Sequence, residues 1–175
     1  IYTLSLHDAL SIYFYKIWLD KNLVYSGAYF ETHQQNLDEA QISKFEQICR
    51  SLELKRGESL LDIGCGWGSF IIYAAKNYGV SCKGITLSKE QATLANKRIE
   101  EEGLSSLCKV EVQDYRELDL NSKFDKITSI EMLHHVGGKN LKTFFSIVNK
   151  LLTEDGRSFI IAITKRNGSH FHNPE

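Results

Sequence analysis

The sequence has no excess of charge of either sign and no long apolar run. Its 175 residues carry 21 lysines and arginines against 22 aspartates and glutamates, a net charge of -1. This balance provides no long-range field for a nucleic acid and no polybasic membrane anchor, so no nucleic-acid partner is expected. No apolar stretch approaches the roughly 20 residues that span a bilayer, and no secretory signal is recognisable. We expect a cytoplasmic protein, with any contact to the inner membrane face peripheral and transient.

The four cysteines form no Cys-x-x-Cys pair and lie far apart along the chain, at Cys49, Cys65, Cys82 and Cys108. Neither a zinc site nor a disulfide framework is indicated, and buried free thiols are expected instead. With 42% hydrophobic and 25% charged residues, the composition is that of one globular domain. Nothing in the sequence predicts the oligomeric state.

The two ends of the chain differ from the rest. Residues 1–12 contain the string TLSLHDAL, which looks like the translation of a sequencing adapter; a short native helix is the alternative. We interpret residues 13–58 as an N-terminal helical cap and residues 59–175 as the main domain. That domain is expected to be truncated at its C-terminus, because the chain stops soon after a strand-like run and without a closing helix.

Strand-like and helix-like segments alternate along the chain. Asn36 and Glu39 form a capping box in front of a helix whose apolar residues recur at helical spacing. Strands are then expected at 59–63, 80–85, 108–112, 125–130 and 158–163, with helices at 70–78, 89–102 and 140–152 and a turn at Gly156. This alternation predicts an α/β fold with a mostly parallel, doubly wound, five-stranded sheet, whose ligands lie at the carboxyl ends of the strands.

A glycine loop follows the first strand in the run LLDIGCGWG, residues 60–68. Its three glycines allow the backbone to approach a ligand closely. A dinucleotide fingerprint needs glycine or alanine at position 69, which is Ser69, and the lysine of a P-loop is also missing. A loop without provision for phosphates suits S-adenosylmethionine (SAM), with Asp62 orienting its ammonium group directly or through water. The alternative is a tight turn that Asp62 caps.

Four further motifs accompany this loop: YSGAYF (25–30), TLSKEQ (86–91), QDYR (113–116) and EMLHHVG (131–137). In this order they resemble the cyclopropane-fatty-acyl-phospholipid synthase family, whose members are class I SAM-dependent methyltransferases with a Rossmann-like fold. The resemblance runs from about residue 13 to 164. The same pattern is similar to plant N-methyltransferases that act on isoquinoline alkaloids, so fold and cofactor are implied more directly than the methyl acceptor.

The resemblance implies a set of SAM-binding residues. Tyr25 and Ser26 would close over the methionine portion, and the glycine loop would line it. Thr86 and Gln91 would bind ribose or methionine groups, and Tyr115 with Arg116 would border the adenine. The full set is Tyr25, Ser26, Asp62, Gly64, Cys65, Gly66, Trp67, Gly68, Thr86, Leu87, Ser88, Gln91, Asp114, Tyr115 and Arg116.

Several of these residues also have purely structural interpretations. Ser88 and Gln91 match a capping box, so Gln91 can serve the helix start alone. Asp114, an acceptor for the adenine amino group, can equally make only an Asx turn. Tyr25 and Tyr29 can be core aromatics of the cap.

The resemblance also implies a reaction that needs no metal. The nucleophile would be a cis double bond of a phospholipid acyl chain, and the methylated product cation would lose a proton to close a ring. In the family a bound bicarbonate is thought to take that proton, held by a cysteine, a glutamate and a histidine. Here Gly27, His134 and Ile161 occupy those places, which argues against bicarbonate, because a small anion in a dry pocket needs several donors.

The remaining candidates for the general base are Glu131, His134 and His135 at the end of the fourth strand. The two adjacent histidines are expected to point to different faces, and His135 is favoured as the base near neutral pH. Another small apolar or amine acceptor, or a SAM-binding fragment without activity, are the alternatives for function. A nicotinamide dehydrogenase is disfavoured by Ser69 and by the lack of an acid directly after the second strand.

Overall fold

The computed structural model describes residues 14–164, which leaves the adapter hypothesis for residues 1–12 outside the described part of the chain. Residues 14–18 are helical. The elements that follow are α2 (Leu37–Leu52), β1 (Ser59–Ile63), α3 (Ser69–Tyr78), β2 (Ser81–Thr86), α4 (Lys89–Glu101), β3 (Cys108–Val112), a 3-10 turn (Tyr115–Glu117), β4 (Phe124–Ile130), α5 (Leu133–Val136), a second 3-10 turn (Gly138–Asn140), α6 (Leu141–Leu151) and β5 (Leu152–Ile161).

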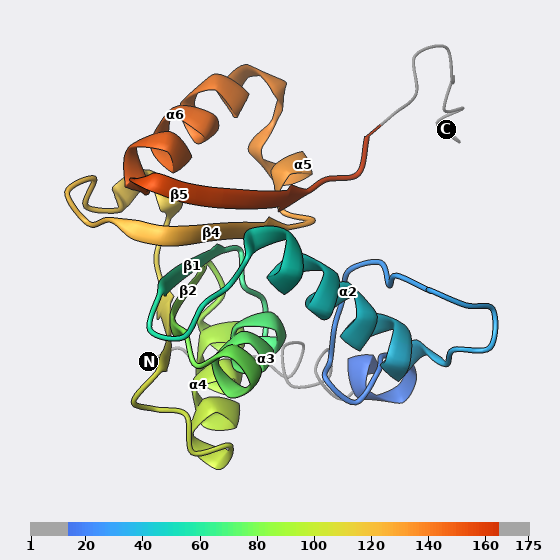
Figure 1. Ribbon diagram of the computed structural model, residues 1–175. Helices are drawn as coiled ribbons and strands as arrows, with labels where there is room; N and C mark the ends of the chain where they lie inside the picture. The colour runs from blue at the N-terminus through green and yellow to red at the C-terminus, as the bar shows by residue number, and fades with distance from the viewer. Residues whose placement is uncertain (1–13, 165–175) are drawn as a thin grey trace, which may run out of the picture.

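The strands form one five-stranded sheet in the order β3-β2-β1-β4-β5, and every neighbouring pair is parallel (Figure 1). This confirms the predicted sheet. Strand order reverses between β1 and β4, and in open α/β sheets ligands bind at the carboxyl ends of the strands beside such a switch point. Figure 1 shows α2 and the segment before it at this carboxyl end of the sheet.

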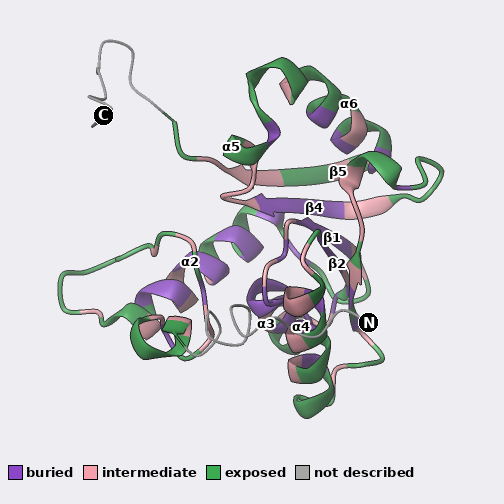
Figure 2. Cartoon of the chain, turned by 180° about the vertical axis from the view of Figure 1, so that it is seen from behind, coloured by how far each residue is buried: buried purple, intermediate pink, exposed green. Residues whose placement is uncertain are grey.

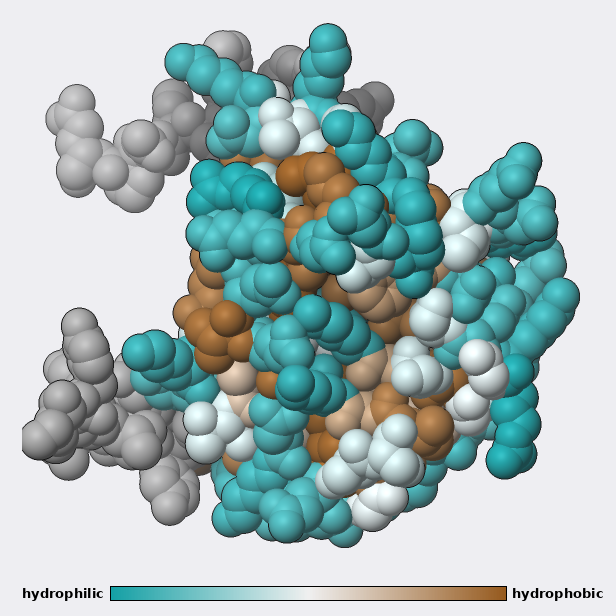
Figure 3. All heavy atoms as spheres, turned by 90° about the vertical axis from the view of Figure 1, so that its left-hand side faces the viewer, coloured by the Kyte–Doolittle hydropathy of each residue, from teal (hydrophilic) through white to brown (hydrophobic). Residues whose placement is uncertain are grey.

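Helices cover both faces of the sheet. One core cluster joins α2, α3 and α4 to the sheet, and the other joins α6 to it. Neighbouring residues of β1 serve opposite faces, since Leu60 belongs to the first cluster and Leu61 to the second. The central strands β1 and β4 are accordingly largely buried, whereas β5 is more exposed (Figure 2). Figure 3 shows the side of the molecule that lies on the left in Figure 1. Hydrophilic residues cover much of this face, and hydrophobic ones show between them.

The last strand differs from its prediction. No turn separates α6 from β5, and the strand begins at Leu152 rather than near Ser158. Phe124 pairs with Leu152 and Lys126 with Arg157, so the ladder contains a register shift that takes up extra residues of β5. Gly156 lies within this irregularity, where an added Cβ would come 3.0 Å from the Leu152 side chain and from the Thr153 backbone. The glycine therefore marks a bulge in a strand, not a turn.

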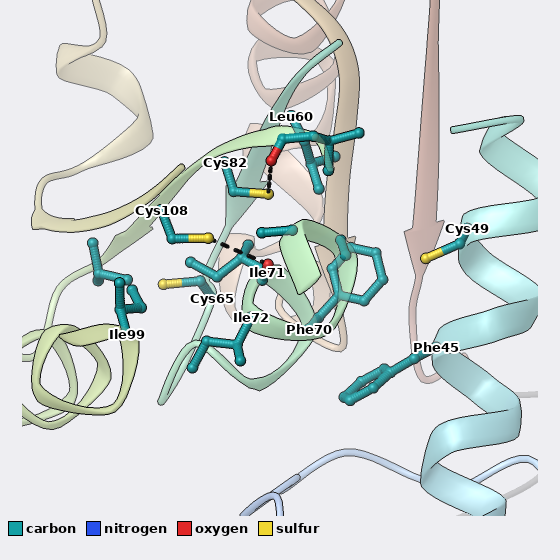
Figure 4. Packing of buried hydrophobic residues seen from close by; sticks show 14 of the residues in the cluster. Phe45, Cys49, Leu60, Cys65, Phe70, Ile71, Ile72, Cys82, Ile99 and Cys108 are labelled. Carbon is teal, nitrogen blue, oxygen red and sulfur yellow. Dashed lines mark hydrogen bonds between the residues drawn. The ribbon is translucent and has the colours of Figure 1, made fainter. Parts of the chain in front are cut away.

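The capping box and the buried thiols are confirmed. The Asn36 side chain accepts from the Glu39 backbone N–H, and the Glu39 carboxylate accepts from the N–H of Asn36. All four cysteines are free and buried, and Cys82 on β2 pairs in register with Cys108 on β3. Figure 4 shows these thiols among apolar side chains, with the Cys108 Sγ donating to the carbonyl of Ile71 at 3.4 Å.

Candidate functional site

Three loops that carry predicted site residues meet at the carboxyl edge of the sheet. They follow β1, β2 and β3 and are tied to one another through the backbone. The N–H groups of Gly64 and Cys65 both donate to the carbonyl of Ile85, and the N–H of Gln113 donates to the carbonyl of Thr86. The sheet topology therefore brings together loops that lie far apart in the sequence.

The three glycines of the first loop have different structural roles. All have positive φ, at +81° for Gly64, +55° for Gly66 and +78° for Gly68. A Cβ on Gly64 would lie 2.6 Å from the Met132 side chain, and one on Gly68 would lie 3.1 Å from Ala95. A Cβ on Gly66 would meet nothing within 4 Å. Gly64 and Gly68 thus permit close packing, while Gly66 faces open space that a ligand can occupy.

Asp62 is buried at the end of β1, with 1% of its surface exposed. Its Oδ1 accepts from the Thr128 hydroxyl at 2.8 Å, and the two residues are register partners on β1 and β4. Burial raises the pKa of Asp62 to about 7, and the Thr128 hydrogen bond opposes that rise. Asp62 therefore ties two central strands together, which is a structural role other than the turn cap considered above.

Aromatic rings from the N-terminal segment, here residues 14–36 before α2, pack on the glycine loop. Tyr15 lies 5.1 Å from Trp67 and 5.0 Å from Tyr25, between ring centroids. Tyr25 is 65% exposed and Tyr29 48% exposed, so the alternative that they are core aromatics is wrong. Trp67 is buried. Cys65 is also buried, and its Sγ would come within 2.7 Å of a Cβ on Gly84, so this side chain packs against β2.

Arg98 and Ser69 hold that N-terminal segment in place. The Arg98 guanidinium donates to the carbonyls of Trp67 at 2.8 Å and Asn22 at 2.9 Å, and to the Ser69 hydroxyl at 3.0 Å. The Ser69 hydroxyl itself donates to the carbonyl of Asn22 at 2.5 Å. Position 69 thus carries a serine that connects two segments. Arg98 was not among the predicted site residues, and its signal in the sequence is its place beside the buried positions of α4.

The loop after β2 makes half of the predicted capping box. The Ser88 hydroxyl accepts from the N–H of Gln91 at 3.2 Å, but the Gln91 side chain accepts from the Thr86 hydroxyl at 2.6 Å. Gln91 therefore turns towards the end of β2 and away from the Ser88 backbone. Leu87 between them is 74% exposed and presents an apolar side chain at this edge.

The loop after β3 contains an Asx turn with an ion pair. Asp114 accepts from the backbone N–H of Arg116 at 2.9 Å, and its other oxygen lies 2.5 Å from the Arg116 guanidinium. The guanidinium and this N–H lower the pKa of Asp114. The Tyr115 ring packs edge-on against Phe144 of α6 at 5.3 Å. The structural role considered for Asp114 is thus present.

Glu131 lies at the end of β4 in a left-handed backbone conformation, with φ +54°. Its N–H donates to the carbonyl of Ile161 at 2.9 Å, and its carboxylate Oε1 accepts from the N–H of Gly27 at 2.9 Å. A side chain at position 27 would crowd that oxygen, since an added Cβ would be 3.1 Å away. Strained backbone at a non-glycine residue is typical of functional sites.

The carboxylate of Glu131 faces a cleft of about 300 Å³. Its walls come from the 27–29 turn, from α2 and from the ends of β4 and β5. The residues that line it are Gly27, Ala28, Tyr29, Lys44, Gln47, Ile48, Glu131, Phe159 and Ile161. The cleft is apolar apart from a few groups, among them the carboxylate and one buried lysine. Lys44 was not among the predicted site residues, although it lies four residues before Ile48 and so on the apolar face of its helix.

The two histidines are placed differently from the prediction. His134 and His135 belong to the short helix α5, which follows the fourth strand, so side chains do not alternate between two faces there. Their ring centroids are 4.1 Å apart, and both residues are exposed. Neither lines the cleft. Of the three candidate bases, Glu131 is the one that the fold brings into the cleft.

Within residues 14–164, no group of three or more His, Cys, Asp or Glu side chains is arranged to hold a metal ion. In the same part of the chain, no helix is both long and apolar enough to cross a membrane.

Comparison with known structures shows the class of protein. A crystal structure of a mycolic acid cyclopropane synthase complexed with SAH and CTAB has a TM-score of 0.82 at 35% identity, covering 87% of this chain and 53% of that one. A coclaurine N-methyltransferase bound to N-methylheliamine and SAH has a TM-score of 0.78 at 26% identity, covering 85% and 43%. The fold is that of the class I SAM-dependent methyltransferases, here with five parallel strands.

The sequence comparisons show the family. The family described as mycolic acid cyclopropane synthetase matches residues 2–174, and the chain belongs to that family. A probable fatty acid methyltransferase of Pseudomonas putida is 40% identical over 164 residues, 94% of this chain and 42% of that protein. The cyclopropane-fatty-acyl-phospholipid synthase of Escherichia coli K12 is 45% identical over 138 residues, 79% of this chain and 34% of that protein. The chain thus spans less than half the length of these relatives.

Proposed function

We propose that the protein containing this chain is a SAM-dependent methyltransferase that transfers a methyl or methylene group to an unsaturated acyl chain of a phospholipid, with Glu131 as general base. The observation that carries this proposal is the Glu131 carboxylate, held by the Gly27 N–H in a largely apolar cleft. Met132, the next residue, packs against Gly64, so the cleft adjoins the glycine loop. The names of the relatives, which include fatty acid methyltransferases and a cyclopropane-fatty-acyl-phospholipid synthase, support a lipid acceptor.

The residues at the carboxyl edge fit SAM. The backbone at Gly66 borders open space, and Leu87 offers an exposed apolar side chain. We propose that the loop from Gly64 to Gly68, Tyr25, and the Thr86–Gln91 pair hold the cofactor, with Asp114 to Arg116 beside its adenine. When bound, SAM supplies a methyl group on a positively charged sulfur. Asp62, being buried, acts on the cofactor through the position of β1 rather than by contact.

Glu131 has the features that a general base requires in this place. The apolar side chains of Ile48, Phe159 and Ile161 line the cleft and can pack along an acyl chain, which would exclude water once bound. Once the double bond has taken up a methyl group, the carboxylate removes a proton from that methyl group. The electron pair of the broken C–H bond then forms the last bond of a three-membered ring. A positioned base of this kind typically contributes on the order of 100- to 10,000-fold in rate.

The same geometry argues against bicarbonate. The resemblance to the family implies that the residue at position 27 helps to hold the bicarbonate. In this protein the N–H of Gly27 already donates to Glu131. A second anion beside that carboxylate would meet like-charge repulsion, with His134 exposed and apolar Ile161 in the cleft wall. Glu131 therefore takes the place of a bicarbonate base, and we prefer it to His135.

The test uses the full-length protein, SAM with a labelled methyl group, and phospholipids with cis-monounsaturated chains. Products are identified by mass and by ring-specific NMR, with and without bicarbonate. We expect lipid products whose rate does not depend on bicarbonate, and at least a 100-fold loss in Glu131→Gln with unchanged affinity for S-adenosylhomocysteine. A rate that rises with bicarbonate, or a fully active Glu131→Gln variant, contradicts the assignment of the base.

A small amine acceptor is the second candidate. A carboxylate in an apolar cleft also suits a cationic or amine substrate, and a structurally similar protein is a coclaurine N-methyltransferase. Labelled methyl transfer to amines, with none to lipids, would favour it. Binding of S-adenosylhomocysteine without any product would indicate a SAM-binding protein without activity. Transient contact with a membrane surface stays a prediction, to be measured with the same lipids as vesicles.

A further inference from the structure

Lys44 is a buried cation beside the cleft. It lies on α2 among apolar residues, and although its side chain is charged, only 5% of its surface is exposed. Its ammonium group donates to the Ser26 hydroxyl at 2.7 Å and to the carbonyl of Gly27 at 2.8 Å, and lies 3.5 Å from the carbonyl of Ser26. Gln41, one turn earlier, donates to the same Ser26 carbonyl at 2.9 Å. Two side chains of α2 thus hold the Ser26–Gly27 turn.

The peptide group between Ser26 and Gly27 links this clamp to Glu131. Its carbonyl oxygen accepts from Gln41 and faces the Lys44 ammonium, while its N–H donates to Glu131 at 2.9 Å. Hydrogen bonds in series through one peptide group polarise one another. Donors on the carbonyl side therefore strengthen the N–H as a donor to the carboxylate, and they fix where that N–H points.

The charge of Lys44 adds an electrostatic effect. The partners of its hydrogen bonds are a hydroxyl and carbonyls, and the two acidic groups that act on it through their field are Glu131 and Asp20. Burying an ammonium group is costly, and a neutral side chain could make similar hydrogen bonds. A charge retained in this place instead suits a nearby carboxylate, because opposite charges attract more strongly where little water screens them.

We infer that Lys44 is a positioning residue for the general base. It holds the Ser26–Gly27 turn so that the Gly27 N–H meets the Glu131 carboxylate. This inference rests on the proposed role of Glu131. It adds a requirement that the family resemblance did not suggest: α2 positions a residue at the end of β4.

The inference has a consequence for pH dependence. Burial lowers the pKa of Lys44 to about 8, while the negative charges of Glu131 and Asp20 oppose that shift. Below this pH the ammonium is charged and the clamp is complete, and above it the charge is lost. Activity should therefore fall as the pH rises through about 8, where Lys44 loses its proton.

The test compares Lys44→Met with Lys126→Met in the full-length protein. Lys126, on β4, is a matched control because it is equally buried, at 5% exposure. Its ion pair is with Glu58, just before β1, and not with a residue of the cleft. Lys44→Met should lower turnover on the order of 100-fold, as misplacement of a reacting group does, and leave S-adenosylhomocysteine affinity unchanged. The fall in activity above about pH 8 should be absent from Lys44→Met, and Lys44→Arg should restore part of the turnover. Lys126→Met should do neither.

The outcomes separate this inference from the proposed function. An inactive Glu131→Gln variant together with a Lys44→Met variant of normal rate that still loses activity above about pH 8 overturns the role of Lys44 alone. A fully active Glu131→Gln variant overturns the base itself. If Lys44→Met does not fold, Lys44→Gln, which keeps a donor without the charge, takes its place in the same comparison. A Lys44→Gln enzyme with the normal pH profile would show that the charge is not required.

Discussion

The backbone N–H of Gly27 donates to the carboxylate of Glu131 at 2.9 Å, across 104 residues of sequence. The two residues are complementary in size, because a Cβ at position 27 would lie only 3.1 Å from that carboxylate oxygen. The family resemblance leads one to expect a cysteine at position 27. The smaller residue here therefore makes room for a carboxylate that the protein supplies itself.

Replacing Gly27 with alanine tests this relationship. The φ of Gly27 is not in the left-handed region, so the added methyl group acts on Glu131 and not on the backbone. We expect turnover to fall about tenfold, equivalent to about 1.4 kcal/mol, with unchanged affinity for S-adenosylhomocysteine. Gly138→Ala is the control, since a Cβ there meets nothing within 4 Å. Equal rates for the two variants would argue against the relationship.

Gly66→Val tests the cofactor loop. The branched side chain enters the open space at the glycine loop, so S-adenosylhomocysteine binding should weaken by at least tenfold in a calorimetric titration. Valine is also strained at φ +55°, and Gly103→Val controls for this, because Gly103 has φ +70° and open surroundings at the end of α4. The control should lose stability but not affinity. Unchanged affinity in Gly66→Val would refute the assignment of the loop.

Asp62 makes stability depend on pH. Its folded pKa of about 7 lies above its ordinary value of 3.8, so its contribution is fully present below pH 3.8 and is lost as pH rises through 7. The loss is at most about 1.4 kcal/mol per pH unit. Asp62→Asn keeps an oxygen for Thr128 but cannot ionise. Denaturation midpoints at pH 5 and pH 8 should show the variant gaining on the wild type at the higher pH; a constant difference would contradict this.

Arg98→Met should release the N-terminal segment from the glycine loop. The change leaves the carbonyls of Trp67 and Asn22 without their guanidinium donor, at a cost of about 1–3 kcal/mol. Hydrogen exchange should speed up for the amides around Asn22, and S-adenosylhomocysteine should bind more weakly. Arg50→Met is the control, since Arg50 is exposed and its ion pair is with Glu46, one turn away on the same helix. Similar exchange in both variants would mean that Arg98 does not hold this segment.

The outer strand of the sheet predicts self-association of the 175-residue chain on its own. Within the described residues β5 pairs with β4 alone, and its apolar residues Phe159, Ile160 and Ile161 are only partly buried. An unpaired edge with apolar side chains is a template for another chain. Light scattering after size-exclusion chromatography should show oligomers or aggregates. A stable monomer would show that this edge is protected.

Much of the fold followed from local patterns. The five strands, their parallel order and the capping box at Asn36 are confirmed, because periodicity and capping chemistry act over a few residues. The start of β5 was wrong, since glycine at 156 indicates a turn by itself and a bulge only when the neighbouring strand is known. The histidines were expected to point to different faces after the strand predicted at 125–130, and the short helix α5 that holds them was not predicted.

The site was predicted at the level of loops but not of contacts. The glycine loop and the ends of β2 and β3 follow from motif order. The clamp by Arg98 and the support by Lys44 depend on pairs 31 and 17 residues apart, and no single position announces such a pair. The one available signal was a polar side chain on the apolar face of a helix, as at Lys44. The choice of Glu131 over His135 needed the cleft itself.

The four buried thiols make local opening of the protein measurable by alkylation. Burial raises the pKa of Cys49 to about 12 and also raises that of Cys65, so neither thiol is reactive in the native state. Alkylation must wait until the surrounding helices and strands separate. Because the cysteines lie on α2, in the glycine loop, on β2 and on β3, the order in which they become labelled would report which part of the domain opens first.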